Sequence, residues 1–178
     1  MGNTLKELGK LDEAEVSYRK AITLKPDLAE AHYNLGNTLK ELGKLDETEV
    51  SYRKAITLKP DYAKAHNNLG NTLKELGKLD EAEVSLIQAI ALNPDYADAH
   101  NNLGVTLQEL GRLDEAEASL RQAITLKPDY ADAHNNLGNT LKELGKLDEA
   151  EVSYRQAITL KPDLAEACLL YISPSPRD

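Results

Sequence analysis

Proline and glycine recur along this chain with a constant step of 34 residues. The prolines of this series are Pro26, Pro60, Pro94, Pro128 and Pro162. All ten glycines fall into two series with the same step: Gly2, Gly36, Gly70, Gly104, Gly138 and Gly9, Gly43, Gly77, Gly111, Gly145. A fixed period of this length is typical of repeat architectures, in which one supersecondary unit is copied and each copy packs on its neighbours. The period therefore favours a solenoid over an ordinary globular core.

Within one period, residues 29–62, the spacing of the side chains predicts two helices. Leucines of the first half fall at i, i+4 and i+7, which is one face of a helix: Leu35, Leu39 and Leu42. Gly43 follows and is expected to end this first helix in a left-handed conformation. Pro60 is expected to stop the second helix, whose inward face falls at i, i+4, i+7 and i+8: Thr48, Tyr52, Ala55 and Ile56.

Acidic residues are expected to cap these helices. Asp46 and Glu49 stand three residues apart, as the two members of an N-terminal capping box do. Asp61 is placed to cap the next first helix.

Small residues are expected to let the two helices of a hairpin approach closely. A glycine inside a helix costs about 0.5–1 kcal/mol relative to alanine, so its recurrence at Gly36 and its equivalents indicates a packing role. Ala82 is the corresponding small residue of a second helix. Thr48 stands where most copies have this alanine, and we expect it to crowd its hairpin.

Each copy also carries an ordered set of residue types. In three successive copies the set reads His66, Leu69, Gly70, Leu73, Ala82, Leu86, Pro94; His100, Leu103, Gly104, Leu107, Ala116, Leu120, Pro128; and His134, Leu137, Gly138, Leu141, Ala150, Tyr154, Pro162. It resembles the signature of the tetratricopeptide repeat (TPR), with histidine at a position that is usually aromatic. The resemblance implies an all-α fold, a right-handed superhelical solenoid of antiparallel helix pairs, that binds proteins or peptides and is not an enzyme.

The pattern divides the chain into repeats of unequal completeness. Residues 1–28 match a truncated repeat, and complete repeats follow at 29–62, 63–96, 97–130 and 131–164. Residues 165–178 start a further repeat and then run into a tail, 168–178, that shares nothing with the period. This tail resembles the translation of a sequencing adapter, and the alternative is a genuine Pro/Ser-rich linker. We therefore expect the sequence to be a fragment of a longer array.

Charge disfavours two classes of partner. The formal net charge is −9, whereas nucleic-acid surfaces and anionic membrane surfaces are recognised by clustered Lys and Arg. No apolar run approaches the roughly 20 residues that a membrane helix needs. We expect neither nucleic acid nor a membrane as a partner.

The repeats contain no motif for catalysis, metal or cofactor binding. The histidines recur one repeat apart, without carboxylate or cysteine at metal-site spacing, and are expected to pack helices: His32, His66, His100 and His134. The single cysteine, Cys168, excludes an internal disulfide, so redox chemistry does not fix the compartment. The sequence predicts no metal site and no cofactor.

Asparagines form three columns on the first helices, which are expected to line the concave face of the solenoid. The columns are Asn34, Asn68, Asn102, Asn136; Asn3, Asn37, Asn71, Asn139, broken by Val105; and Asn67, Asn101, Asn135, preceded by Tyr33. A carboxamide has donors and an acceptor, so it can pair with the N–H and C=O of an extended peptide. The alternative is that some of these amides bridge adjacent repeats. Replacing the first column with alanine would then lower stability together with binding.

The Asn34 column and the stretch 35–41 are similar to the repeats of O-linked N-acetylglucosamine transferase. This resemblance implies that Asn34, Asn68, Asn102 and Asn136 hold a substrate polypeptide. We expect a scaffold that binds an extended peptide or protein. The alternatives are the substrate-recognition arm of a glycosyltransferase or sulfotransferase whose catalytic domain lies outside this sequence, and an array that self-associates through its repeats.

Overall fold

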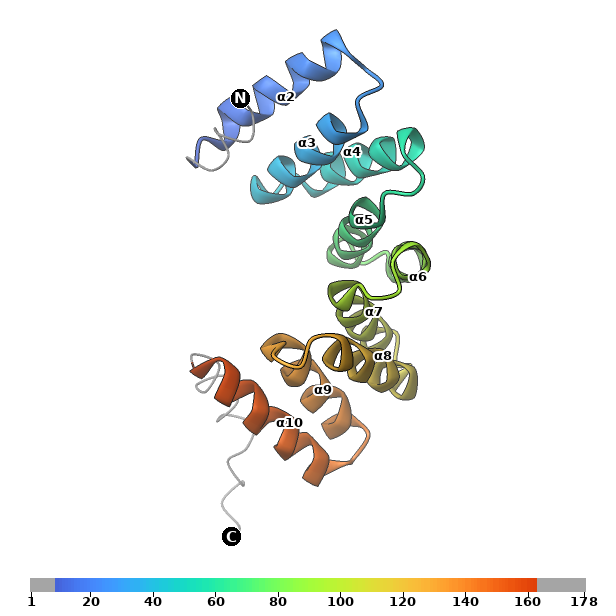
Figure 1. Cartoon of the computed structure of the whole chain (residues 1–178), viewed down its shortest axis with the longest axis vertical. Coiled ribbons are helices and arrows are strands. Elements are labelled where there is room, and N and C mark those ends of the chain that lie inside the picture. The colour runs from blue at the N-terminus through green and yellow to red at the C-terminus, as the bar shows by residue number, and fades with distance from the viewer. Residues whose placement is uncertain (1–8, 163–178) are drawn as a thin grey trace. The chain divides into compact units, whose positions relative to one another are not determined.

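The computed structural model describes residues 9–162, and nine α-helices follow one another there in antiparallel pairs (Figure 1). The all-α prediction is confirmed. Expectations for Asn3 and for the tail that contains Cys168 lie outside the described residues. The helices are α2 (Leu11–Leu24), α3 (Ala29–Glu41), α4 (Leu45–Leu58), α5 (Ala63–Glu75), α6 (Leu79–Leu92), α7 (Ala97–Glu109), α8 (Leu113–Leu126), α9 (Ala131–Glu143) and α10 (Leu147–Leu160).

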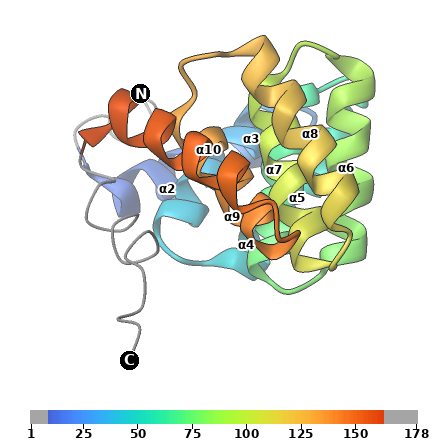
Figure 2. The same cartoon turned by 90° about the horizontal axis from the view of Figure 1, so that it is seen from below.

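These helices belong to two compact units, residues 1–94 and 95–178. In the first unit α2 packs on α3, α3 pairs with α4, α4 packs on α5 and α5 pairs with α6. In the second unit α7 pairs with α8, α8 packs on α9 and α9 pairs with α10 (Figures 1 and 2). Within each unit a helix therefore contacts mainly its neighbours in sequence, as the helices of a solenoid do.

The first helices, α3, α5, α7 and α9, each end in a hydrogen-bonded glycine turn. Gly43 has a φ of +74°. Its N–H donates to the Lys40 carbonyl at 3.0 Å, and the N–H of Lys44 donates to the Leu39 carbonyl at 2.9 Å. The two bonds form a Schellman motif, which satisfies carbonyls that the helix end would leave unpaired. The predicted turns are confirmed, because the same positive φ recurs at Gly77, Gly111 and Gly145.

The side-chain cap predicted for α4 does not form. The N-cap is Lys44, no side chain hydrogen-bonds there, and Asp46 lies inside the first turn. Its expected partner, Glu49, accepts hydrogen bonds from Lys78 and Arg53 instead. The prediction is wrong because the Glu49 carboxylate is used between repeats. Asp46 still lies close to the positive end of the helix dipole, where a carboxylate is favourable.

The cap predicted for α5 is also wrong. Tyr62, not Asp61, is the N-cap, and no side-chain cap bond forms. Asp61 contributes its backbone instead, because its carbonyl accepts the N–H of Ala63 at 3.0 Å.

Glycines inside the first helices lie directly against the second helices. A Cβ placed on Gly70 would lie 2.6 Å from Leu86 Cγ and 3.2 Å from the Ala82 carbonyl oxygen. A Cβ on Gly36 would meet the Tyr52 ring at 2.6 Å. The expected close approach is present, and it leaves no room for a side chain at these positions.

Thr48 is fully buried, and its hydroxyl donates to the Lys44 carbonyl at 2.9 Å. Its helix, α4, has the same 14-residue length as α6, which carries Ala82 at the equivalent position. The extra atoms are thus accommodated without a change in helix length, and their energetic cost stays a prediction.

The core of each unit consists of leucine, alanine and tyrosine from adjacent helices. One cluster in the first unit contains Tyr52, Leu69, Leu73 and Ala82, and one in the second contains Leu120, Leu137, Leu141, Ala150 and Tyr154. None of the helices within residues 9–162 has the length and apolar character needed to cross a bilayer.

Candidate functional site

The asparagine columns lie on the first helices of both units. Within a helix, members of the first two columns are three residues apart and therefore share a face. The first unit carries Asn34 and Asn37 on α3 and Asn67, Asn68 and Asn71 on α5; the second carries Asn101 and Asn102 on α7 and Asn135, Asn136 and Asn139 on α9.

In the first unit, hydrogen bonds connect these amides from one repeat to the next. Asn68 Nδ2 donates to Asn37 Oδ1 at 3.0 Å and to the Tyr33 hydroxyl at 3.2 Å. Asn37 Oδ1 also accepts the Tyr52 hydroxyl at 2.7 Å. Asn67 Nδ2 donates to Asn68 Oδ1 at 3.2 Å. Asn68 thus bridges α5 to α3, and both of its N–H groups are used within the protein.

The second unit has a related arrangement with one acceptor missing. Asn136 Nδ2 donates to Asn101 Oδ1 at 3.0 Å, and Asn101 Nδ2 lies 3.5 Å from Asn102 Oδ1. Val105 occupies the position equivalent to Asn37 and offers no side-chain acceptor. Bridging between repeats therefore also involves Asn136.

Two amides of the second column keep their donors free. Asn37 Oδ1 is held by the Tyr52 hydroxyl, and Asn139 Oδ1 accepts the Tyr154 hydroxyl at 2.8 Å. Neither Nδ2 group has a hydrogen-bond partner within residues 9–162. Burial raises the pKa of the Tyr52 hydroxyl, so the phenol stays protonated and donates. Both asparagines are partly exposed, and the tyrosine bond fixes the orientation of each carboxamide.

The remaining asparagines of the three columns differ in their hydrogen bonds within the protein. Asn71 Nδ2 donates to Glu75 on its own helix at 3.3 Å. Asn102 and Asn135 also interact with other residues. The Asn34 carboxamide makes no hydrogen bond with the described part of the chain.

Sequence reasoning did not assign a polar role to the tyrosines. A buried tyrosine normally finds a partner for its hydroxyl. Tyr52 and Tyr154 occupy a position where other copies have Leu86 and Leu120, and this alternation was the available signal. Tyr33 interrupts an asparagine column and adds an aromatic contact, with its ring centroid 4.8 Å from that of Tyr62.

The histidines also have a polar role that the sequence did not predict. The Nε2–H of His32 donates to the Pro26 carbonyl at 3.0 Å, and equivalent bonds of 3.1 Å and 2.9 Å join His66 to Pro60 and His134 to Pro128. They tie the first turn of a first helix to the loop that follows the preceding second helix. Within residues 9–162, no three His, Cys, Asp or Glu side chains gather to hold a metal ion.

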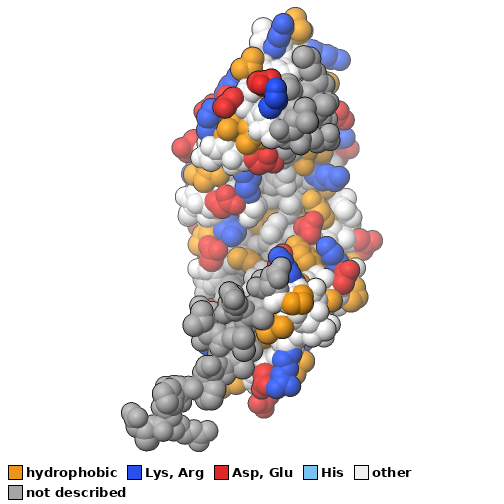
Figure 3. Space-filling model, turned by 90° about the vertical axis from the view of Figure 1, so that its left-hand side faces the viewer, with side chains coloured by type: hydrophobic (Ala, Val, Ile, Leu, Met, Phe, Trp, Pro, Cys, Tyr) orange, Lys and Arg blue, Asp and Glu red, His pale blue; other side chains and the backbone are white. Residues whose placement is uncertain are grey.

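Charged side chains of both signs are interspersed over the face of the molecule in Figure 3. On the first helices, Lys40 Nζ pairs with Glu75 at 3.0 Å and Gln108 Nε2 donates to Glu143 at 2.5 Å, in both cases from one repeat to the next. The Lys40 charge is thus paired with a carboxylate of the next repeat, and Gln108 makes the corresponding contact as a neutral amide.

Helix pairs, glycine turns and contacts that recur with one period define a tetratricopeptide-repeat protein, a class whose fold serves protein interaction. The family model described as the cilia and flagella-associated protein 70 C-terminal domain matches residues 1–172. The chain belongs to this family.

Solved structures of other TPR proteins share the fold. A crystal structure of MamA is 28% identical, with a TM-score of 0.83 over 93% of this chain and 97% of that chain. YrrB, described as a TPR protein with an unusual peptide-binding site, is 27% identical, with a TM-score of 0.78 over 96% and 88%. TTC0263, a thermophilic TPR protein from Thermus thermophilus, is 28% identical, with a TM-score of 0.75 over 96% and 93%. Among curated proteins, no match is found.

Proposed function

We propose that this chain is a scaffold that binds an extended polypeptide segment on the face of its first helices, through asparagine carboxamides. The observation that carries the proposal is the pair of free donors at Asn37 and Asn139. Each has its oxygen fixed by a buried tyrosine, so a ligand would not have to order the side chain, which reduces the cost of binding. YrrB, a structural relative with a peptide-binding site, supports the same class of ligand.

An extended ligand fits these donors because its backbone carbonyls are not used internally. A helical peptide has already paired most of its carbonyls, whereas an extended one presents them to an external N–H. In this proposal the second column contributes donors to the ligand. The first column, Asn34, Asn68, Asn102 and Asn136, combines bridging with contact through its remaining atoms, since Asn68 and Asn136 both donate to the preceding repeat.

The transferase alternative uses this face in the same way, because an arm that recognises substrate must also bind polypeptide. Peptide binding is the step shared by both functions, and a binding experiment therefore tests both.

The experiment uses linear peptides selected from a displayed random library against the full chain. Binding of a synthesised peptide is measured by fluorescence anisotropy for the parent protein and for Asn37→Asp/Asn139→Asp. Aspartate keeps the oxygen that accepts the tyrosine hydroxyl and replaces the free NH₂ with an acceptor. Asn93→Asp, at the exposed C-cap position that follows α6, is the control for adding a negative charge away from the site.

We expect the double variant to lose roughly 5- to 140-fold in affinity, because two lost hydrogen bonds of roughly 0.5–1.5 kcal/mol each contribute about 1–3 kcal/mol together. Melting temperature and helicity should stay close to those of the parent protein, and Asn93→Asp should bind normally. Selection of no binder, or unchanged affinity of the double variant, would contradict the proposal.

A further inference from the structure

Tyr33 adds a hydroxyl to the first-helix face of the first unit, at a position where other copies have Asn67, Asn101 and Asn135. Tyr33 and Asn37 are four residues apart on α3, so their side chains come from adjacent turns of one face. Each has an oxygen that accepts a hydrogen bond from Asn68 Nδ2, at 3.2 Å for Tyr33 and 3.0 Å for Asn37. The two side chains are therefore gathered around a single nitrogen of α5.

The hydroxyl hydrogen of Tyr33 is unused within residues 9–162. A hydroxyl has one hydrogen to donate, and its oxygen can accept, whereas a carboxamide nitrogen only donates. The Tyr33 oxygen is therefore the acceptor in its bond with Asn68, and its hydrogen bonds to no other described residue. Tyr33 is partly exposed, as Asn37 is. This face of α3 thus carries two neighbouring groups with an unused donor.

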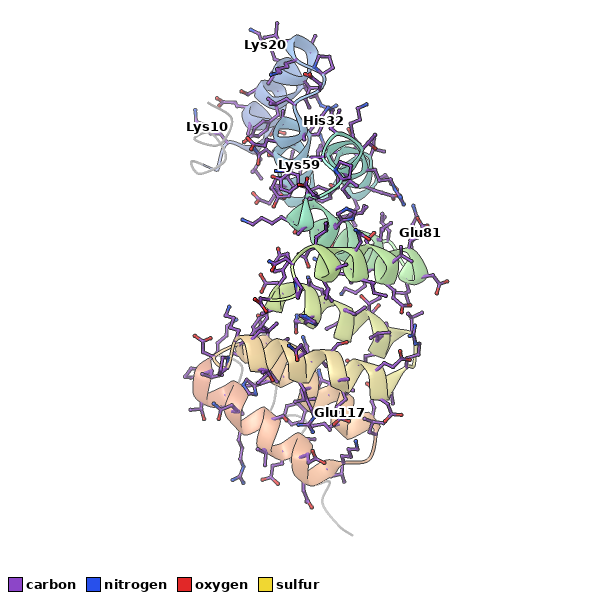
Figure 4. All side chains as sticks on the ribbon, turned by 45° about the vertical axis from the view of Figure 1, so that its right-hand side comes forward. Lys10, Lys20, His32, Lys59, Glu81 and Glu117 are labelled. Atoms are coloured by element: carbon purple, nitrogen blue, oxygen red, sulfur yellow. The ribbon has the colours of Figure 1, made fainter. Side chains whose placement is uncertain are left out.

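The ring of Tyr33 is held in place by its neighbours. Its centroid lies 5.9 Å from that of Tyr52 and 4.8 Å from that of Tyr62, and tilted ring contacts of this kind are favourable. Lys59, which is labelled in Figure 4, extends this row, with its Nζ 4.9 Å from the centroid of the Tyr62 ring. A ligand would meet a Tyr33 side chain that is already ordered, which reduces the cost of binding.

We propose that Tyr33 and Asn37 bind two backbone carbonyls that lie two residues apart in the extended ligand, with Tyr33 donating to one carbonyl and Asn37 to the other. The inference rests on the proposed function and adds to it a second donor residue and a register. Adjacent turns of a helix are about 5.4 Å apart. Carbonyls on the same side of an extended chain recur every second residue, about 6.6 Å apart. Donors from adjacent turns of α3 match this spacing.

Neutral carbonyls fit this pair better than a ligand carboxylate does. Burial is the main cause that raises the pKa of the neighbouring Tyr52 hydroxyl, and the negative charges of Glu41 and Glu75 add to it, although Lys40 pairs with Glu75 at 3.0 Å. A ligand carboxylate close to Tyr52 would meet the same negative charges, whereas a peptide carbonyl carries no net charge. The pair is therefore suited to the backbone of a ligand and not to an acidic side chain.

The equivalent positions of the second unit do not provide such a pair. On α7, Val105 replaces the asparagine and has no hydrogen-bonding side chain. On α9, Asn139 has an unused donor, but Asn135, one turn before it, interacts with other residues. The first unit thus offers two adjacent contacts to the ligand where the second offers one, and we expect the first unit to set the register of the ligand.

The contribution of Tyr33 is tested with Tyr33→Phe, which removes the hydroxyl and keeps the ring. Asn68 retains its bond to Asn37 in this variant. Affinity of the full chain for a selected linear peptide is measured by fluorescence anisotropy, and thermal melting followed by circular dichroism monitors the fold. We expect a loss of about 2- to 12-fold in affinity, as for one hydrogen bond, with a melting temperature close to that of the parent protein.

Tyr130→Phe is the control, because it removes the same atom from a partly exposed tyrosine at the N-cap of α9, outside the asparagine columns. It should bind the peptide as the parent protein does.

The register is tested with peptides in which one backbone amide at a time is replaced by an ester, whose carbonyl is a weaker acceptor. One replacement that weakens binding to the parent protein should have no further effect on Tyr33→Phe, and another should have no further effect on Asn37→Asp. Such non-additivity identifies the two groups that contact each other. The two carbonyls identified in this way should lie two residues apart.

The outcomes separate this inference from the proposed function. Unchanged affinity of Tyr33→Phe beside weakened binding by Asn37→Asp would overturn the role of Tyr33 and leave the proposed function standing. Coupled carbonyls at another spacing, or coupling of Tyr33 to a ligand carboxylate that is lost on amidation, would overturn the assignment of the pair to the backbone. A library that yields no binder would overturn the proposed function and this inference with it.

Discussion

In the proposed function, Asn37 serves both the fold and the ligand. Its oxygen accepts from Tyr52 and Asn68, while its NH₂ group is free within the described residues. Its place on a first helix was predictable from the repeat. Its partners were not, because they lie 15 and 31 residues away and meet it only when adjacent helices pack.

At Gly70, steric contact opposes helix propensity. Gly70→Ala gains about 1 kcal/mol of propensity, but its Cβ would lie 2.6 Å from Leu86 Cγ. Overpacking of this kind costs about 1–3 kcal/mol, so we expect a net loss of stability in urea unfolding. Adding Leu86→Ala should make the effect of the alanine smaller. A Gly70→Ala protein more stable than the parent would contradict the close packing.

At Thr48, removal of buried atoms is expected to stabilise the protein. The hydroxyl bonds to a carbonyl that already accepts the Thr48 N–H, and this back-bonding adds little to a helix. Thr48→Ala should therefore raise the free energy of unfolding by up to about 1 kcal/mol, and the urea midpoint should rise with it. The reverse change, Ala82→Thr, should lower it. An unchanged or lower midpoint for Thr48→Ala would show that the site is not crowded.

At the scale of the helices, the end of a helix was predictable from local sequence where it depends only on the conformation of the backbone. The turn at Gly43 was predictable because only a left-handed residue closes a Schellman motif. The capping role of Glu49 was not, because Lys78 and Arg53 compete for its carboxylate from outside the first turn. The prediction of a side-chain cap was therefore wrong at a carboxylate that can pair either with its own helix end or with a lysine of the next repeat.

The ion pairs between second helices should make stability depend on pH. Hydrogen bonding to Lys78 is the main cause that holds the pKa of Glu49 below its ordinary value of 4.5. A lowered folded-state pKa contributes stability above the unfolded pKa, and this contribution is lost as pH falls through the folded value. Glu49→Gln should lower the unfolding free energy at neutral pH by up to about 1 kcal/mol and flatten its decline in acid.

Glu30→Gln is the control for this comparison, because Glu30 is exposed on a first helix and lies outside these ion pairs. It should leave the acid dependence of the unfolding free energy unchanged. Parallel acid profiles for the parent protein and Glu49→Gln would contradict a stabilising role of the pair.

For the whole molecule, the period was enough to predict the helical fold and the family. Membership of a TPR family and the helix pairs of both units agree with that prediction. Which asparagines bridge repeats and which keep an unused donor was not predictable. Repeats that look alike in sequence differ at one position, where Asn37 offers an acceptor in one unit and Val105 offers none in the other. Each unit nevertheless retains one asparagine with a fixed carboxamide and an unused donor within the described residues, so we expect both units to contribute to binding one class of ligand.

The most direct test is an NMR titration that follows the side-chain carboxamide signals of the ¹⁵N-labelled chain as a selected linear peptide is added. The Asn→Asp variants assign the signals of Asn37 and Asn139, and Asn93 serves as the internal reference. If the free NH₂ groups bind peptide carbonyls, the signals of Asn37 and Asn139 should shift in a saturable manner with the same dissociation constant as the anisotropy measurement, while that of Asn93 stays in place. Saturable peptide binding that leaves the Asn37 and Asn139 signals unmoved would contradict the account.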